Sequence, residues 1–200
     1  MRYNRGKYRH HSIRLKTYDY SQQGAYFVTV CTGNRLCLFG DIDDGKMRLS
    51  PIGDIVRKFW LESPKHFHNA DLDQFIIMPN HIHGIIVLVG DGIEVKRRGV
   101  QLNAPTMNYY SQISPRRNTL SVIARTFKGA LTKWCKNNCF EYFRWQRNYY
   151  DHIVRNEKEL NAIREYIIYN PIKWELDREN PLSKNYNIDF DVYFRGIYEK

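Results

Sequence analysis

The sequence has few cysteines, and their spacing excludes the common zinc motifs. The four thiols stand at Cys31, Cys37, Cys135 and Cys139, and no two of them form a Cys-x-x-Cys pair. This spacing fits neither a zinc ribbon nor a zinc finger, and it favours free thiols in a reducing compartment.

Long apolar runs are also missing. No run approaches the roughly 20 residues that a membrane-spanning helix needs. Residues 1–16 are basic and contain no apolar segment of the kind found in secretory signals. The sequence therefore predicts a soluble, cytoplasmic protein without a membrane partner.

The sequence has fewer acidic than basic residues. The 200 residues include 31 Lys and Arg against 21 Asp and Glu, which gives a formal charge of +10, and they include 15 Tyr, 10 Phe and 4 Trp. Cations that meet phosphates and rings that stack on bases are common in nucleic-acid binders. Composition therefore favours a nucleic-acid partner without fixing the fold.

Hydrophobic periodicity predicts an alternation of strands and helices. Expected elements in the first half are a strand at 25–32, a hairpin of 36–40 and 46–49 around Asp43-Asp44-Gly45, a helix from Pro51 that ends before Pro64, and a strand–turn–strand unit over 72–89. The second half is expected to form a helix capped by Asn118 or Thr119, an extended aromatic segment at 143–154 that contains a strand and its approach, and a helix over 157–170. This order predicts an α+β ferredoxin-like sandwich, an antiparallel sheet with helices mainly on one face. We expect a single domain over 1–181, with a basic loop at about 91–118, and a C-terminal tail over 182–200.

Two histidines open the most apolar strand. His81 and His83 follow the turn signal Pro79-Asn80 and precede the run Ile85–Val89. Alternate residues of a strand share a face, so both imidazoles are expected on one side, where they can share a metal ion with a third ligand. An ordinary half-exposed histidine pair is the alternative interpretation.

The last predicted helix offers a third ligand and a nucleophile. Tyr166 and Asn170 are four residues apart and share a helix face. If that face covers the histidines, the side-chain oxygen of Asn170 can reach the same metal. The phenol of Tyr166 would then face an electrophile that the ion activates.

Several basic positions are candidates for contact with phosphates, and a solvated basic surface is the alternative for each of them. They are Arg9, Arg14 and Lys16 in the N-terminal arm, Arg97, Arg98, Arg116 and Arg117 in the basic loop, and Lys128 on the predicted helix that follows the loop.

Four ordered motifs are similar to those of one known family. They are Gly24–Val30, Met78–Gly84, Trp145–His152 and Tyr166–Pro171. In this order they resemble the REP-associated tyrosine transposases, relatives of the single-tyrosine HUH (IS200-like) transposases. The resemblance covers about residues 10–181 and leaves out the basic loop.

The resemblance implies a mechanism and a partner. His81 and His83 would be the HUH histidines, Asn170 the third ligand of a Mg²⁺ or Mn²⁺ ion, and Tyr166 the nucleophile that cuts single-stranded hairpin DNA through a 5′-phosphotyrosine. Arg147 and His152, which lie in the third motif, would contact DNA or support the site. A nucleoid-associated monomer or homodimer is expected, and Tyr149, Tyr150 and Tyr169 are rival phenols.

Three other functions stay open at this point. They are a rolling-circle-type HUH nickase, a non-catalytic hairpin DNA- or RNA-binding regulator on the same fold, and a His-x-His iron oxygenase. The last lacks a helper carboxylate at a suitable spacing in the sequence.

Overall fold

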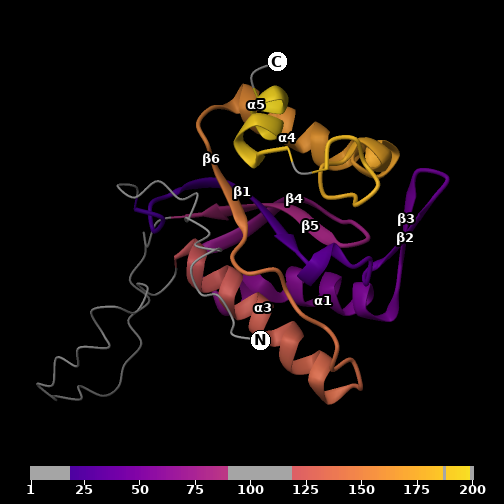
Figure 1. The fold of residues 1–200 in the computed structure, drawn as a ribbon. Coiled ribbons are helices and arrows are strands. Elements are labelled where there is room, and N and C mark those ends of the chain that lie inside the picture. Colours follow the sequence, from indigo (N-terminus) through magenta and orange to yellow (C-terminus); the bar gives the residue numbers. More distant parts are fainter. Residues whose placement is uncertain (1–18, 90–118, 187, 199–200) are drawn as a thin grey trace, which may run out of the picture.

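The computed structural model describes residues 19–89, 119–186 and 188–198 (Figure 1). The elements are β1 (Gly24–Cys31), η1 (Gly33–Arg35), β2 (Gly40–Asp43), β3 (Lys46–Leu49), α1 (Pro51–His66), β4 (Ala70–Ile77), β5 (His81–Leu88), α3 (Leu120–Asn137), β6 (Tyr150–Val154), α4 (Glu157–Tyr169), η2 (Pro171–Leu176) and α5 (Phe190–Tyr198). Seven candidate DNA-binding residues lie outside the described part of the chain: Arg9, Arg14, Lys16, Arg97, Arg98, Arg116 and Arg117.

Four strands form one antiparallel sheet in the order β4-β5-β1-β6. Helix α1 connects β1, through the β2–β3 hairpin, to β4, and α3 lies between β5 and β6. Both helices cover the same face of the sheet (Figure 1). This is the order of a ferredoxin-like sandwich, so the predicted α+β fold is confirmed.

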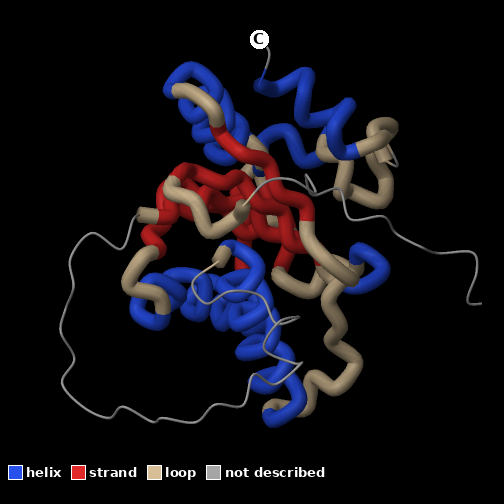
Figure 2. Tube along the Cα trace, turned by 90° about the vertical axis from the view of Figure 1, so that its left-hand side faces the viewer, coloured by secondary structure: helices blue, strands red, loops and turns tan. Residues whose placement is uncertain are grey.

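The sheet is buried on both faces, because α4 and α5 lie against the side opposite to α1 and α3. Figure 2 shows the strands between these two groups of helices. Strand β1 alternates accordingly: Tyr26 and Val28 pack with α1 and α3, whereas Phe27 packs with α4 and α5. In β5, Ile82 and Ile86 face the first group, and Ile85 faces the second.

A glycine lets α1 approach the middle of the sheet. The indole of Trp60 lies over Gly84 of β5, where a Cβ atom would come within 2.4 Å of its Cζ2 atom. Because a larger residue at 84 would displace this buried indole, the glycine between the histidine pair and the apolar run has a packing reason.

Helix α4 begins after a capping residue, Asn156. The side chain of Asn156 accepts a hydrogen bond from the backbone N–H of Glu159 at 2.9 Å.

Residues 182–200, which the sequence analysis set apart as a tail, contribute α5. Its Phe194 is completely buried against Phe27 and Tyr166. The positions of α4 and α5 relative to the sheet are thus fixed by packing.

Two predicted boundaries are wrong. The first strand of the hairpin is Gly40–Asp43 rather than 36–40, because Asp44 and Gly45, both with positive φ, form the two-residue turn. Helix α1 continues past Pro64 to His66; the proline removes one backbone N–H donor, and the helix ends two residues later. Within the described ranges, no helix combines the length and apolarity required to cross a membrane.

Candidate active site

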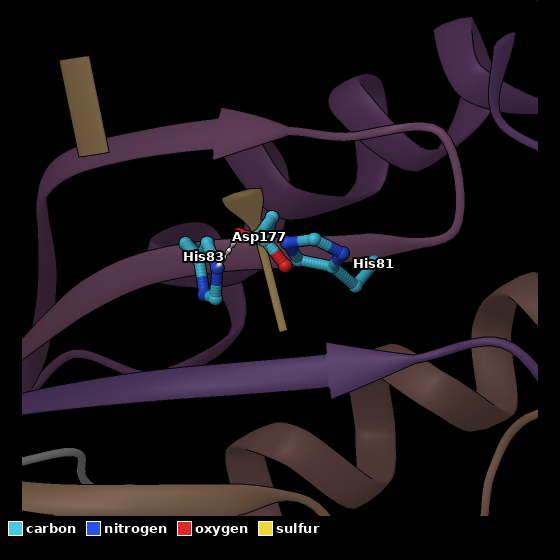
Figure 3. A group of neighbouring side chains, drawn as sticks. All are labelled: His81, His83 and Asp177. Carbon is cyan, nitrogen blue, oxygen red and sulfur yellow. Dashed lines mark ion pairs between the residues drawn. The ribbon is translucent and has the colours of Figure 1, made fainter. Parts of the chain in front are cut away.

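The histidine pair lies where the sequence predicts it. His81 and His83 project from β5 to the face covered by α4, both are fully buried, and their ring centroids are 4.2 Å apart (Figure 3). The alternative of two half-exposed histidines is therefore wrong. Two imidazoles buried side by side need partners, because each carries polar nitrogens that water cannot reach.

A carboxylate that the sequence analysis missed completes the cluster. Asp177 follows η2 and points at the two histidines, and the ligand atoms of the three residues all lie within 4.8 Å of one another (Figure 3). One carboxylate oxygen of Asp177, Oδ2, lies 3.7 Å from Nε2 of His83. The other, Oδ1, accepts a hydrogen bond from the backbone N–H of Glu179 at 2.6 Å, which orients the carboxylate.

The cluster favours the protonation states that metal ligands need. Burial lowers the pKa of His81 well below its usual value, and the neighbouring His83 lowers it further, so the imidazole is neutral at pH 7. Burial by itself would raise the pKa of Asp177, but the facing histidines and the amide of Asn170 outweigh it and hold this pKa below the usual range. A neutral His81 imidazole and an ionised Asp177 carboxylate can coordinate a cation without first losing protons.

Two buried atoms beside Asp177 lack a hydrogen-bond partner among the described residues. They are Nε2 of His81 and Oδ1 of Asn170. Buried polar atoms are rarely left unpaired in proteins, and an absent ion is a common reason when they are. The arrangement therefore fits a cation held by His81, His83 and Asp177.

Asn170 lies at this cluster, but through its amide nitrogen. Its Nδ2 donates a hydrogen bond to Oδ2 of Asp177 at 2.8 Å, while its Oδ1 has no hydrogen-bond partner in the part of the chain that the structure describes. The position is where the sequence places it, one helical turn beyond Tyr166. Its role as a metal ligand stays a prediction, because the contact shown by the structure is support of Asp177.

Tyr166 reaches the cluster from α4. Its hydroxyl lies 3.0 Å from Nε2 of His83 and donates a hydrogen bond to Oδ2 of Asp177 at 3.1 Å. Burial and the negative charge of Asp177 raise the pKa of this phenol well above its usual value, so it is protonated at neutral pH. The rival Tyr169 is 45% exposed and lies against Lys173, with the ammonium 5.9 Å from the ring centroid.

A buried ionic network holds the segment that carries Asp177. Glu179 is completely buried, and its carboxylate pairs with Nε of Arg35 at 2.9 Å and with Arg178. The thiol of Cys31 donates to the same carboxylate at 3.4 Å, and burial raises the pKa of this thiol well above its usual value. The network fixes residues 177–179 against β1 and η1. The sequence analysis did not predict it, because charged residues near the end of a polar segment look the same whether they are buried or exposed.

Lys128 is directed into the protein rather than toward solvent. Its ammonium donates hydrogen bonds to the backbone carbonyls of Gln146 at 2.8 Å and Asn148 at 2.7 Å, and its own carbonyl accepts from the indole of Trp145. Burial lowers its pKa to about 8. These contacts favour a clamp on the 145–148 segment over a phosphate contact.

Replacing Lys128 with methionine should therefore destabilise the fold. Two carbonyls would lose a charged donor, and such bonds are each worth about 1.5–3 kcal/mol. We expect a lower melting temperature, measured by circular dichroism, whereas Lys133→Met on the exposed side of the same helix leaves it unchanged. A stable Lys128→Met variant whose DNA affinity depends less on salt would instead assign the residue to a phosphate.

The two remaining candidates are Arg147, within the 145–148 segment, and His152, four residues after it. Arg147 is exposed, as a phosphate contact requires. His152 of β6 lies 2.7 Å through Nε2 from Oε1 of Glu159, whose other oxygen accepts from the backbone N–H of Arg155. This geometry places His152 at the start of α4 as a support for the helix that carries Tyr166.

Comparisons with known proteins agree with the fold. No family model matches the chain. An uncharacterized protein of Haemophilus influenzae is 41% identical over 179 residues, which are 88% of this chain and 96% of that protein. A second protein of that organism, named as a REP-associated tyrosine transposase, is 24% identical over 161 residues, covering 78% of this chain and 74% of its own.

A solved structure has a similar fold. The structure of a REP-associated tyrosine transposase bound to a REP hairpin matches with a TM-score of 0.53 at 18% identity, over 81% of this chain and 74% of that one. This likeness concerns the fold. The chain therefore belongs to one family with the uncharacterized Haemophilus influenzae protein, and it is a relative of the REP-associated tyrosine transposases, whose fold it has.

Proposed function

We propose that this protein is a metal-dependent endonuclease and strand transferase that cuts and rejoins single-stranded hairpin DNA through a 5′-phosphotyrosine. The observation that carries the proposal is the Tyr166 hydroxyl, 3.0 Å from Nε2 of His83 inside a His-His-Asp cluster. A phenol held beside a cation site is suited to attack a phosphate.

The cation would be held by His81, His83 and Asp177. When bound there, a divalent ion would stabilise negative charge on the phosphate oxygens during the attack. Carboxylate oxygens suit both Mg²⁺ and Mn²⁺, but two imidazoles are unusual for Mg²⁺, which prefers oxygen ligands. We therefore propose Mn²⁺ as the better fit of the two.

The covalent step exchanges one phosphodiester oxygen for another. The oxygen of Tyr166 forms a bond to phosphorus, the bond to the 3′ oxygen breaks, and the products are a 5′-phosphotyrosine and a free 3′ hydroxyl. Tyr166 loses its proton and the departing 3′ oxygen gains one, so the step consumes no proton overall. In the structure the phenol donates a hydrogen bond to Oδ2 of Asp177 at 3.1 Å, which orients the hydroxyl at the cation site. Attack by a 3′ hydroxyl reverses the step, rejoins the DNA and restores Tyr166.

Hairpin DNA is the proposed substrate because of the relatives and the charge. The solved relative is bound to a REP hairpin, and this chain carries a formal charge of +10. Exposed Arg147, together with the predicted phosphate contacts in the arm and the basic loop, would supply the salt-dependent part of the affinity.

One observation favours a second candidate. Two histidines and a carboxylate are also the ligands of non-haem iron oxygenases, and Asp177 supplies a carboxylate that its sequence spacing did not reveal. The position of Tyr166 and the fold of the relatives favour phosphoryl transfer over oxygen chemistry.

The test is a denaturing gel of end-labelled single-stranded hairpins taken from repeats that flank the gene. With Mn²⁺ we expect a shortened DNA product and a protein-linked band, and with chelator neither. Tight binding without any cut in Mn²⁺ or Mg²⁺, over a wide set of hairpins, would contradict the proposal and favour a hairpin-binding regulator. A duplex of the same sequence serves as the control and should stay intact.

Metal binding should also stabilise the fold. A ligand present at 100 times its dissociation constant stabilises the state that binds it by about 2.7 kcal/mol. We expect the melting temperature to rise with Mn²⁺ and to fall back with chelator. His81→Ala should lose the rise, whereas His66→Ala, an exposed histidine at the end of α1, should keep it. No rise in the unaltered protein would show that the cluster does not hold this ion.

A further inference from the structure

Asn80, the residue before the histidine pair, is completely buried at the turn between β4 and β5. Its side chain contacts two segments that are distant in sequence and the neighbouring His81. The amide nitrogen Nδ2 donates to the backbone carbonyl of Arg35 at 3.0 Å and to that of Glu179 at 2.8 Å, and Oδ1 lies 2.8 Å from Nδ1 of His81.

These contacts leave one orientation for the amide. A side-chain amide has two N–H donors, and here both point at carbonyl oxygens, which can only accept. Exchanging the nitrogen and oxygen of Asn80 would set its oxygen against two other oxygens at hydrogen-bond distance. The oxygen must therefore face His81.

The orientation of Asn80 determines the tautomer of His81. Oδ1 of an amide accepts hydrogen bonds and cannot donate one, so Nδ1 of His81 has to carry the proton. In a neutral imidazole the other nitrogen then holds the lone pair. That nitrogen, Nε2, is the buried atom of His81 without a partner in the described structure, and it belongs to the His-His-Asp cluster.

We infer that Asn80 is a positioning residue that locks His81 in the Nδ1–H tautomer and so presents the Nε2 lone pair to a cation. The inference rests on the proposed function for the identity of the cation, but the tautomer itself does not depend on it. Hydrogen bonds of this kind behind a ligand commonly change metal affinity by about 10–100-fold.

The same amide connects His81 to the segment that carries Asp177. Glu179 offers its carbonyl to Asn80 and its N–H to Oδ1 of Asp177. Two hydrogen bonds therefore connect Asn80 to Asp177 through the backbone of Glu179. Asn80 sets the tautomer of one ligand and the position of the segment that holds another.

The test reads the tautomer directly, by long-range ¹H–¹⁵N NMR of the histidine rings in protein without metal. In the unaltered protein we expect His81 to carry its proton on Nδ1. In Asn80→Ala we expect His81 to shift toward the Nε2–H form that free imidazole side chains prefer, and calorimetry should show Mn²⁺ affinity lower by about 10–100-fold.

Asn69→Ala is the matched control, because Asn69 is a buried asparagine at the start of β4. It should affect stability without changing the tautomer of His81 or the Mn²⁺ affinity. An Nε2–H tautomer in the unaltered protein would overturn the inference even if Asn80→Ala failed to fold. An Asn80→Ala protein that is less stable but keeps tautomer and affinity would reduce Asn80 to a structural residue.

Neither measurement uses DNA cleavage. An Nε2–H tautomer of His81 in the unaltered protein would refute the role of Asn80 and leave the phosphotyrosine proposal intact. If His81 has the expected tautomer but the protein does not cut DNA, the phosphotyrosine proposal would be refuted and the role of Asn80 would stand.

Discussion

Tyr166→Phe should abolish DNA cleavage and leave hairpin binding unchanged. The substitution removes the hydroxyl that lies beside His83 and Asp177 and keeps the ring that packs against Phe27 and Phe194. Without the attacking oxygen no covalent intermediate can form, and loss of a nucleophile costs an enzyme on the order of 10³-fold or more in rate. Cleavage on a denaturing gel and binding by fluorescence anisotropy measure the two effects separately.

Tyr169→Phe is the matched control, since it removes a phenol three residues further along the same helix. Tyr169 is exposed, and its ring faces the ammonium of Lys173. Its loss should leave the cleavage rate within a few-fold of the unaltered protein. If Tyr166→Phe still cut and Tyr169→Phe did not, the nucleophile would be reassigned.

The second large effect is expected from Asp177→Asn, which should lose both Mn²⁺ binding and cleavage. The amide keeps the shape of the carboxylate and still accepts from the N–H of Glu179, but it removes the anionic oxygen that faces the histidines. Mn²⁺ affinity should fall by more than the roughly 10–100-fold typical of a lost supporting contact, because a charged ligand is removed. Isothermal titration calorimetry measures this directly.

Glu175→Gln controls for charge, because it neutralises an exposed carboxylate two residues away. It should leave Mn²⁺ affinity unchanged. Full Mn²⁺ binding by Asp177→Asn, together with its loss in Asn170→Ala, would restore the sequence-based assignment of Asn170 as the third ligand.

Much of the scaffold follows from local patterns in the sequence. The first strand of the sheet, the start of α1 at Pro51 and the start of α4 at Glu157 each depend on signals within a few residues, and each appears in the structure close to its predicted position. The shared face of His81 and His83 has the same origin, because it depends only on the two-residue period of a strand. Such features need no knowledge of distant contacts.

The missing part of the site depends on contacts between distant segments. Asp177 lies seven residues beyond Asn170 and past Pro171, so no helical or strand period relates it to Tyr166. Its position depends on the contacts of Glu179 with Arg35, which is far away in the sequence. A buried charge with a distant partner looks, in the sequence alone, like any residue of a polar tail.

Lys128 is a second case in which contacts between distant segments could not be predicted from the sequence. On the predicted helix it stood among exposed cations, and a phosphate contact was a reasonable interpretation. Only the fold brings the carbonyls of Gln146 and Asn148 to its ammonium. Charge in a sequence predicts a partner of opposite sign, but it does not show whether that partner is DNA or the backbone of the same chain.

The most direct test of the account is mass spectrometry of the protein–DNA adduct. Protein incubated with Mn²⁺ and a cleavable hairpin is digested with protease and nuclease, and the peptide that carries the residual nucleotide phosphate is sequenced by fragmentation. We predict the modification on Tyr166, joined through a 5′ phosphate. A nucleotide on Tyr149, Tyr150 or Tyr169, or cleavage that leaves no peptide modified, would contradict the central claim.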